Sequence, residues 1–346
     1  MSPWSNKPAR LAGIAATFVI VLSACSSSGG SSPAASTAGG SSPAASTAPS
    51  EAAAASKAPC GTVNLALNPW VGYEANAAVI KYIAEKELGC KVVTKSLDEQ
   101  TSWQGFETGV VDAIVENWGH EDLVAKYITD KKVALDAGLT GNEGIIGWYV
   151  PKAFADANPD ILTASTDPTI LNKYADQFKT SESGDKGQIL DGDPSFVTND
   201  QAMVDGMGLN YKVVFSGSEA ASNKAIKAAS DAGKPILAYY YEPNWFSATV
   251  PLTHIALPAW TQGCDTADPK KIKCDYPPYH LNKIVSAKLA TSGSPFYDLI
   301  KNFKWTNEDQ NSVAASITQD SLSDDDAAKK WVDAHPDVWK AWLAQP

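Results

Sequence analysis

The stretch 62–97, "TVNLALNPWVGYEANAAVIKYIAEKELGCKVVTKSL", decides the fold. Residues 62–68 are typical of a β-strand that stops at the turn formed by Asn68 and Pro69. The following segment has the apolar spacing of a helix that ends in Gly89, and residues 90–97 are again strand-like. Since two parallel strands need a long crossover between them, this order predicts a βαβ unit.

The same alternation of elements continues along the chain. Residues 102–109 predict a short helix and residues 111–117 a third strand. The elements predicted after these are a strand at 141–152, a helix at 198–208, a strand at 211–217, a helix at 218–232, a strand at 235–241 and helices within 324–343. An extended segment at about 153–195 separates the two series. We therefore expect an α/β protein with two lobes and a cleft, each lobe a mostly parallel sheet flanked by helices.

The first 58 residues are not expected to belong to either lobe. Residues 1–24 combine Lys7 and Arg10 with an apolar run too short for a membrane span, which is typical of a signal peptide. The run ends in "LSAC", which looks like a bacterial lipobox and implies cleavage before Cys25 and acylation of its thiol. An ordinary signal cut with a spare Cys25 is the alternative. Residues 25–58 are rich in Ser, Gly, Ala and Pro and predict a flexible tether.

The net charge of the chain limits its partners. It is −11 for all 346 residues and −13 after removal of residues 1–24, which hold two basic and no acidic residues. Such a charge argues against nucleic acid as a partner and against a basic patch that binds the membrane surface. We expect any membrane association to depend on the lipid anchor alone, at the extracellular face of a bacterial membrane.

Four cysteines remain in the exported chain, and an even number outside the cell favours disulfides. Cys60 and Cys90 each precede one strand of the βαβ unit, so they would lie side by side, near disulfide range. Cys264 and Cys274 would then close a short loop. A zinc site is the competing interpretation, but the chain has no C-x-x-C motif and its four histidines are scattered.

No catalytic motif is present, so we expect a protein that is not an enzyme and has no cofactor or metal. One alternative is a secreted hydrolase in which His120 or His254 acts with a serine. Another is a wall-associated protein whose aromatic side chains stack on glycans.

The chain is rich in aromatic residues, with 11 Trp, 12 Tyr and 9 Phe. Trp70, Trp118 and Tyr241 each end a predicted strand, where ligands of α/β sheets bind. Aromatic rings that converge there suit a quaternary ammonium, which offers a diffuse positive charge and no hydrogen-bond donor. The backbone amides of Val71, Gly72 and Tyr73 open a helix and could bind a carboxylate at the other end of the ligand, as in a betaine.

Four stretches together resemble the glycine betaine/proline betaine substrate-binding proteins of ABC transporters. They are residues 63–80, 105–122, 144–152 and 239–246, and the resemblance spans about 60–345. It implies a two-lobed periplasmic-binding-protein fold, type II-like, that binds its ligand in the cleft. One lobe would comprise 59–150 and 249–346, and the other 151–248.

The resemblance also implies which residues surround the ligand. Trp118 and Tyr241 occupy the places of two rings of the family's aromatic box, and Phe196 in "DGDPSF" is the nearest match to a third. Family members often carry Trp at the last two places, so Tyr241 and Phe196 are departures and Trp70 could supply the missing ring. Trp148 and Asn244 complete the set of expected ligand-binding residues.

The function that this resemblance implies is that of a monomeric, lipid-anchored receptor. It would deliver glycine betaine or a related quaternary amine to a membrane permease driven by a cytoplasmic ATPase. Choline, carnitine or proline betaine could take the place of glycine betaine.

Overall fold

A computed structural model describes residues 59–196 and 198–344. The predicted signal peptide, Cys25 and the tether lie outside the described residues. Within these two ranges, no helix combines the length and the apolar character needed to cross a membrane.

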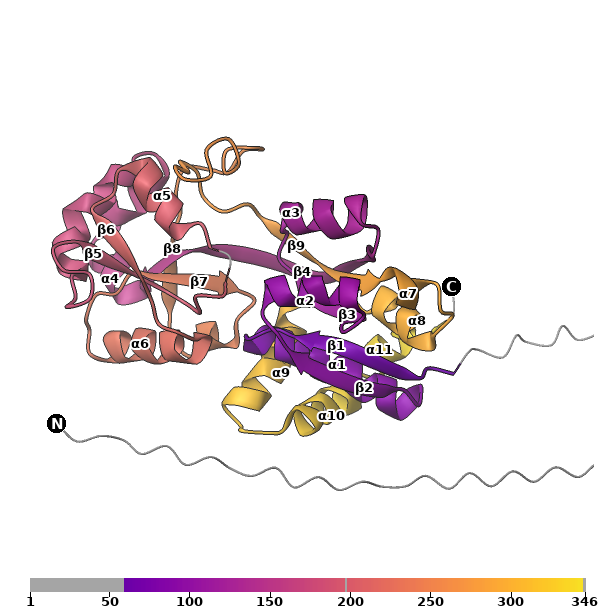
Figure 1. Ribbon diagram of the computed structural model, residues 1–346. Helices are drawn as coiled ribbons and strands as arrows, with labels where there is room; N and C mark the ends of the chain where they lie inside the picture. The colour runs from indigo at the N-terminus through magenta and orange to yellow at the C-terminus, as the bar shows by residue number, and fades with distance from the viewer. Residues whose placement is uncertain (1–58, 197, 345–346) are drawn as a thin grey trace, which may run out of the picture. The chain divides into compact units, whose positions relative to one another are not determined.

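The first part of the sheet grows from the predicted βαβ unit (Figure 1). Strand β1 (Thr62–Leu67) pairs in parallel with β2 (Lys91–Ser96) and with β3 (Ala113–Asn117). Next to β3 lies β9 (Tyr279–Ser286), which is antiparallel to it, although the two strands are far apart in sequence. The carboxyl ends of β1 and β3 thus point to the same edge, as expected.

A long strand, β4 (Ala134–Pro151), joins the first part of the sheet to the second. Residues 134–144 pair with β9, and residues 145–149 pair with β7 (Ala238–Glu242). The second part continues from β7 to β5 (Gly187–Asp191) and β6 (Tyr211–Phe215), all parallel to one another. Strand β8 (Leu252–Ile255) pairs with the end of β4.

Helices follow the strands in the expected order. The bounds in the first half of the chain are α1 Val71–Glu87, α2 Glu99–Thr108, α3 Glu121–Val124, η1 Ala125–Asp130, α4 Lys152–Ala157, η2 Pro159–Ser165 and η3 Pro168–Phe178. Those in the second half are α5 Asp200–Met207, α6 Glu219–Asp231, η4 Trp245–Ala248, α7 Ala287–Ala290, α8 Pro295–Asn302, α9 Asn307–Thr318, α10 Asp324–Ala334 and α11 Pro336–Trp342.

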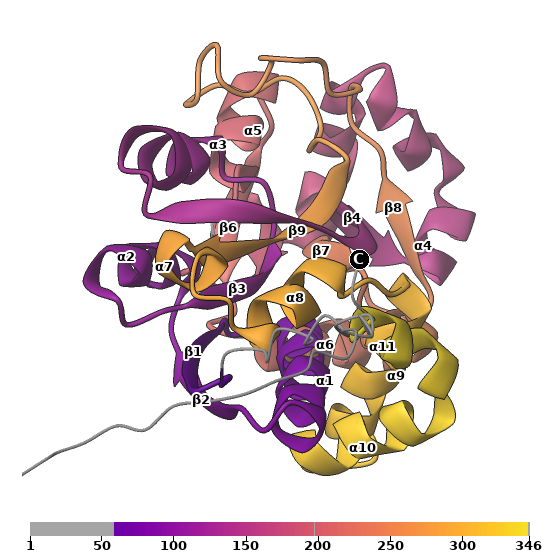
Figure 2. The same ribbon diagram turned by 90° about the vertical axis from the view of Figure 1, so that its right-hand side faces the viewer.

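The C-terminal helices pack against the first helix of the chain, α1 (Figure 2). Trp305, Trp331 and Trp342 are buried there, with the rings of Trp331 and Trp342 stacked at a centroid distance of 5.6 Å. These rings belong to the hydrophobic core. Part of the Trp content of the chain therefore serves to pack the core.

The α/β architecture agrees with the prediction, with two differences in detail. Each part of the sheet is mixed, because β4 and β9 run antiparallel to their neighbours. The segment 153–195 holds α4, η2, η3 and β5, none of which was predicted, and β8 and β9 lie after Pro251, where no strand was predicted. The predicted lobe boundaries stay a prediction.

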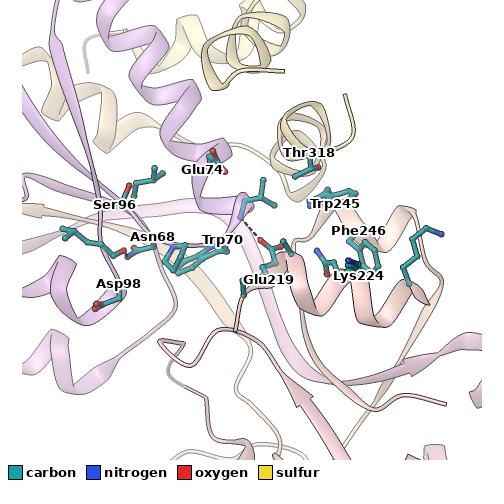
Figure 3. A pocket seen from close by; sticks show the side chains of 18 residues that line it. Asn68, Trp70, Glu74, Ser96, Asp98, Glu219, Lys224, Trp245, Phe246 and Thr318 are labelled. Atoms are coloured by element: carbon teal, nitrogen blue, oxygen red, sulfur yellow. Dashed lines mark hydrogen bonds between the residues drawn. The ribbon is translucent and has the colours of Figure 1, made fainter. Parts of the chain in front are cut away.

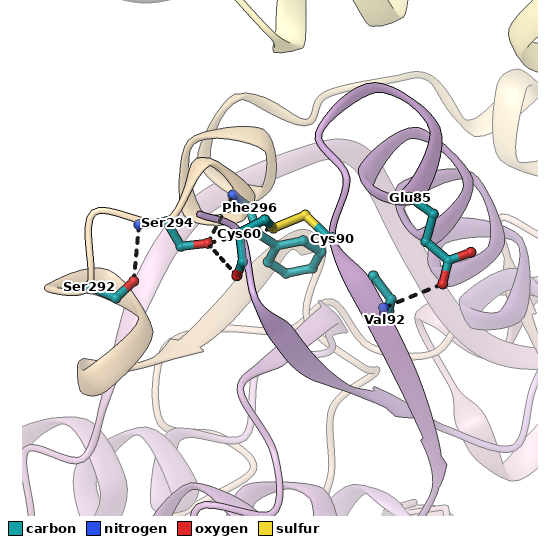
Figure 4. Close-up of a disulfide and its surroundings, with 7 residues drawn as sticks. All are labelled: Cys60, Glu85, Cys90, Val92, Ser292, Ser294 and Phe296. Atoms are coloured by element: carbon teal, nitrogen blue, oxygen red, sulfur yellow. Dashed lines mark hydrogen bonds between the residues drawn. A yellow bond between two sulfur atoms is a disulfide. The ribbon is translucent and has the colours of Figure 1, made fainter. Parts of the chain in front are cut away.

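Both predicted disulfides are present, Cys60–Cys90 and Cys264–Cys274. Figure 4 shows the first of them beside Phe296, where it joins the beginnings of β1 and β2. The two cysteines can meet because the parallel register pairs Thr62 with Lys91. The disulfide therefore ties the beginning of β1 to the beginning of β2.

Candidate ligand-binding site

A cavity of about 760 Å³ opens at the carboxyl end of β3 and is called the cage cavity below. Its walls include the turn after β3, the strand β7, the disulfide loop around Cys264, the beginning of β9 and residues at or next to the beginnings of α1, α2 and α5. Four of the predicted ligand-binding residues line it, namely Trp70, Trp118, Phe196 and Tyr241. Three of these residues, Trp70, Trp118 and Tyr241, were singled out because each ends a predicted strand.

Three aromatic rings from three separate segments meet on one side of the cage cavity. The ring centroid of Trp118 lies 5.7 Å from that of Tyr241 and 5.5 Å from that of Tyr279. Tyr239 lies on the same face of β7 as Tyr241, with the two centroids 6.3 Å apart. Since the negative faces of such rings attract a cation, this cluster is suited to an ammonium group without N–H donors.

A second pair of rings also borders the cage cavity. Trp70, the residue just before α1, has its ring centroid 5.7 Å from that of Phe196, and the two rings are nearly perpendicular. Phe196 comes from the turn after β5, so this pair joins elements of the two parts of the sheet. The structure therefore places Phe196 in a wall of the cavity, as the resemblance implies.

Two glycines allow the ring of Trp118 to lie where it does. A Cβ atom added to Gly144 would stand 2.5 Å from the Cζ3 atom of Trp118, which is closer than atoms can approach. Gly119 has a φ of +103°, a backbone conformation that favours glycine, and it lies against Tyr279. The position of the rings thus depends on two residues without side chains.

The polar lining of the cage cavity is acidic. Its carboxylates are Glu99, Glu121, Asp122 and Asp265. The described residues that line it include no Lys or Arg. Such a lining favours a cation over an anion. Among the described residues, no three His, Cys, Asp or Glu are placed to hold a metal ion.

His120 lies in the turn after Trp118 and lines the cage cavity. Its Nε2 atom lies 2.8 Å from Oε1 of Glu99. Burial alone would lower the pKa of His120, but the hydrogen bond and the charge of Glu99 raise it above its usual value. The imidazole is therefore paired with a carboxylate and is not poised to activate a serine.

Trp148 does not reach the cage cavity. It is buried in β4 opposite Tyr239, and its indole N–H donates to Oδ1 of Asp200 at 2.9 Å. Burial raises the pKa of Asp200, and the neighbouring Asp191 raises it further. Trp148 therefore packs beside Tyr239 on the same face of the sheet, and it is not among the residues that line the cage cavity.

The amides at the beginning of α1 face a different space, a groove of about 990 Å³ between α1 and α6. Figure 3 shows this groove with Glu219 among its lining side chains. The N–H of Val71 donates to Oε2 of Glu219 at 2.9 Å. Gly72 faces Gln310, and the hydroxyl of Tyr73 accepts from the amide of Val115. A carboxylate of the protein itself thus occupies the place expected for a ligand carboxylate.

Asn244 belongs to the same interaction. Its side-chain amide donates to Oε1 of Glu219 at 3.0 Å, so both oxygens of this carboxylate are used. Burial raises the pKa of Glu219, while the N–H of Val71 and Asn244 lower it. Asn244 therefore holds Glu219 at the beginning of α1 and does not line the cage cavity.

Three aromatic residues of the cavity were not among the predicted ligand-binding residues. Tyr239 could have been found from the alternation of the strand, which puts it on the face of Tyr241. Tyr279 and Trp260 lie in a part of the chain for which no strand or helix was predicted. The only local signal for Tyr279 is the preceding pair of prolines, Pro277 and Pro278, which is typical of a rigid turn.

The comparisons with known proteins agree with this geometry. The model of a family described as the substrate binding domain of ABC-type glycine betaine transport systems matches residues 61–334. The trimethylamine N-oxide-binding protein of Pelagibacter ubique (strain HTCC1062) is 29% identical over 282 residues, which cover 78% of this chain and 87% of that protein.

Solved structures show the same fold. Lactococcal OpuAC, closed around glycine betaine, aligns with a TM-score of 0.62 at 22% identity, covering 82% of this chain and 100% of that chain. An ABC-transporter choline-binding protein in complex with choline aligns with a TM-score of 0.66 at 20% identity, covering 82% and 92%. The two-lobed α/β fold of periplasmic binding proteins is thereby confirmed. With a family match over most of its length, the chain belongs to the substrate-binding domains of ABC-type glycine betaine transport systems.

Proposed function

We propose that this protein binds a trimethylammonium compound in the cage cavity and delivers it to the permease of an ABC importer. Glycine betaine, choline and trimethylamine N-oxide share this group. The observation that carries the proposal is the contact of Trp118 with both Tyr241 and Tyr279 around a cavity whose polar lining is acidic.

A specific observation favours the alternative that the ligand is choline or trimethylamine N-oxide. Neither has a carboxylate, and the cage cavity offers no Lys or Arg among its described lining residues to receive one. The amide of Val71, which was expected to do so, donates to Glu219. The similarity to a trimethylamine N-oxide-binding protein points in the same direction.

Isothermal titration with a matched set of compounds tests the proposal. The set contains glycine betaine, choline, trimethylamine N-oxide and 3,3-dimethylbutanol, a neutral analogue with the shape of choline. We expect at least one charged compound to bind, and the neutral analogue to bind at least about tenfold more weakly, because the rings attract charge. Equal binding of choline and its neutral analogue would contradict a cation cage, and no binding at millimolar concentrations would contradict the function.

We also propose that the chain is exported, anchored through a lipid on Cys25 and active as a monomer at the extracellular face of the membrane. The sequence of residues 1–58 supports the first two points. A Cys25→Ser variant should lose the incorporation of a labelled fatty acid and appear in the culture medium, because the tether would then have no anchor. Retention of the label in that variant would exclude Cys25 as the site of acylation.

A further inference from the structure

Glu116, near the end of β3, is a buried carboxylate that accepts hydrogen bonds from four side chains. It is 1% exposed. Its Oε1 atom accepts from the indole N–H of Trp70 at 2.7 Å and from that of Trp118 at 2.8 Å. Its Oε2 atom accepts from the amide of Gln310 at 2.9 Å and from that of Asn76. Trp70 and Trp118 belong to the predicted ligand-binding set, whereas Glu116, Asn76 and Gln310 do not.

The shared oxygen fixes the two indoles relative to each other. An indole nitrogen is a donor only, so each ring must turn its N–H edge toward Glu116 to satisfy that donor. Trp70 precedes α1 and Trp118 follows β3, so no local backbone structure sets the angle between their rings. Both rings border the cage cavity, and one carboxylate oxygen therefore sets two of its walls.

The charge of Glu116 has no counter-charge inside the described chain. Its partners are neutral N–H groups, and the charged group that acts on it most is Glu99, another carboxylate. A buried carboxylate without a cation is costly, because hydrogen bonds replace only part of its hydration. A ligand cation in the cage cavity would supply the missing positive charge on the other side of the indoles.

We propose that Glu116 is a positioning residue that orients Trp70 and Trp118 together, and that its negative charge strengthens the binding of a cationic ligand. The second half of this statement rests on the proposed function, whereas the first half does not. The amide oxygens of Asn76 and Gln310 have no hydrogen-bond partner. They could accept from a Gln at position 116 if their amides turned over, so Glu116→Gln can remove the charge and keep the rings in place.

The pH dependence of ligand affinity reports on the charge of Glu116. A purely structural role of this residue would not produce such a dependence. Burial raises its pKa to about 7, although the indoles and Gln310 lower it. The titratable groups that face it are Glu99 of α2, Tyr73 of α1 and Tyr241 of β7, while α9 contributes the neutral Gln310. Since a cation favours the ionised carboxylate, affinity should rise with pH through this range and level off above it.

The first experiment needs no ligand. The indole ¹⁵N–¹H signals of Trp70 and Trp118, assigned with single Trp→Phe variants, are followed from pH 5.5 to 8.5 in the full-length protein. We expect the two signals to shift with one common midpoint in the wild type and to lose that midpoint in Glu116→Gln. Signals that do not shift, or that shift with different midpoints, would overturn the positioning role.

The second experiment measures choline binding at pH 6 and pH 8. Choline has a fixed charge, so only the protein titrates. The wild type should bind about tenfold more tightly at pH 8 than at pH 6. Glu116→Gln should bind about tenfold more weakly than the wild type at pH 8 and show a smaller pH dependence. Deprotonation of His120 also raises the affinity for choline as the pH rises, but His120 is present in the variant. The part of the pH dependence that the variant loses is therefore due to Glu116.

A matched control is Asp309→Asn, which removes another carboxylate that accepts an indole N–H, that of Trp331, but does not line the cage cavity. It should keep the pH dependence of choline binding. An unchanged affinity and slope in Glu116→Gln would overturn the role of the charge. If the wild type binds none of the trimethylammonium compounds, the proposed function fails, and the indole titration still decides on the positioning role.

Discussion

Replacement of Trp118 by alanine is expected to weaken the binding of a trimethylammonium ligand by about 30-fold or more. A cation against an indole face is worth up to about 2 kcal/mol when water is excluded, and each 1.4 kcal/mol corresponds to a factor of ten in Kd. Trp118 also holds the rings of Tyr241 and Tyr279, with which its own ring is in contact. Its removal therefore opens the centre of the cage.

The measurement is isothermal titration with whichever compound the wild type binds most tightly. Trp118→Phe is the graded variant, because it keeps a ring and loses the N–H that donates to Glu116. Phe215→Ala is the control, since Phe215 is 47% exposed and lies outside the cage cavity. Circular dichroism must show that each variant is folded. An affinity of Trp118→Ala equal to that of the wild type would remove this ring from the site.

The fold was predictable where the pattern was local. The βαβ unit at 62–97 and the series at 198–241 show strand and helix periodicities, and the structure contains their strands and helices in that order. Strand β5 was missed because its five residues, "GQILD", follow a segment rich in turn-forming residues. The pairing of β4 with β9 joins residues more than a hundred positions apart, and no local periodicity records such a partner.

The sequence predicted those residues of the cage cavity that lie at the ends of predicted strands. Trp70, Trp118 and Tyr241 were found because ligands bind beyond the carboxyl ends of the strands. Glu116 could have been suspected, since it is the one carboxylate in the buried run "AIVEN" and buried carboxylates need partners. Three of its four partners, however, come from two other segments, α1 with the residue before it and α9, and only the folded chain brings them together.

The expected amide cap shows a limit of sequence reasoning. The free amides at the beginning of a helix attract an anion, and Val71 indeed donates to a carboxylate. That carboxylate is Glu219, 148 positions along the chain, and not a ligand group. The chemistry of the helix end was inferred correctly, but its partner depends on how α6 packs against α1.

The second large effect concerns stability. Replacement of both Cys60 and Cys90 by serine is expected to lower the free energy of unfolding by about 3–4 kcal/mol. The cysteines are 30 positions apart, and a cross-link over such a loop reduces the conformational entropy of the unfolded chain by that amount in the chain-entropy model. Denaturation with urea, followed by Trp fluorescence, measures the change. A loss below about 1 kcal/mol would contradict the prediction.

The second disulfide provides a matched comparison, because its loop is shorter and its place is different. Cys264 and Cys274 are 10 positions apart, so their replacement should cost about 1 kcal/mol less than that of the first pair. Their loop, however, places Asp265 and Thr266 in the wall of the cage cavity. Cys60 and Cys90 lie at the beginnings of β1 and β2, whereas the cavity lies at the carboxyl end of the sheet. The first double variant should therefore lose stability and keep its affinity, and the second should lose affinity as well. Equal affinities in both variants would mean that the loop need not be held in place for ligand binding.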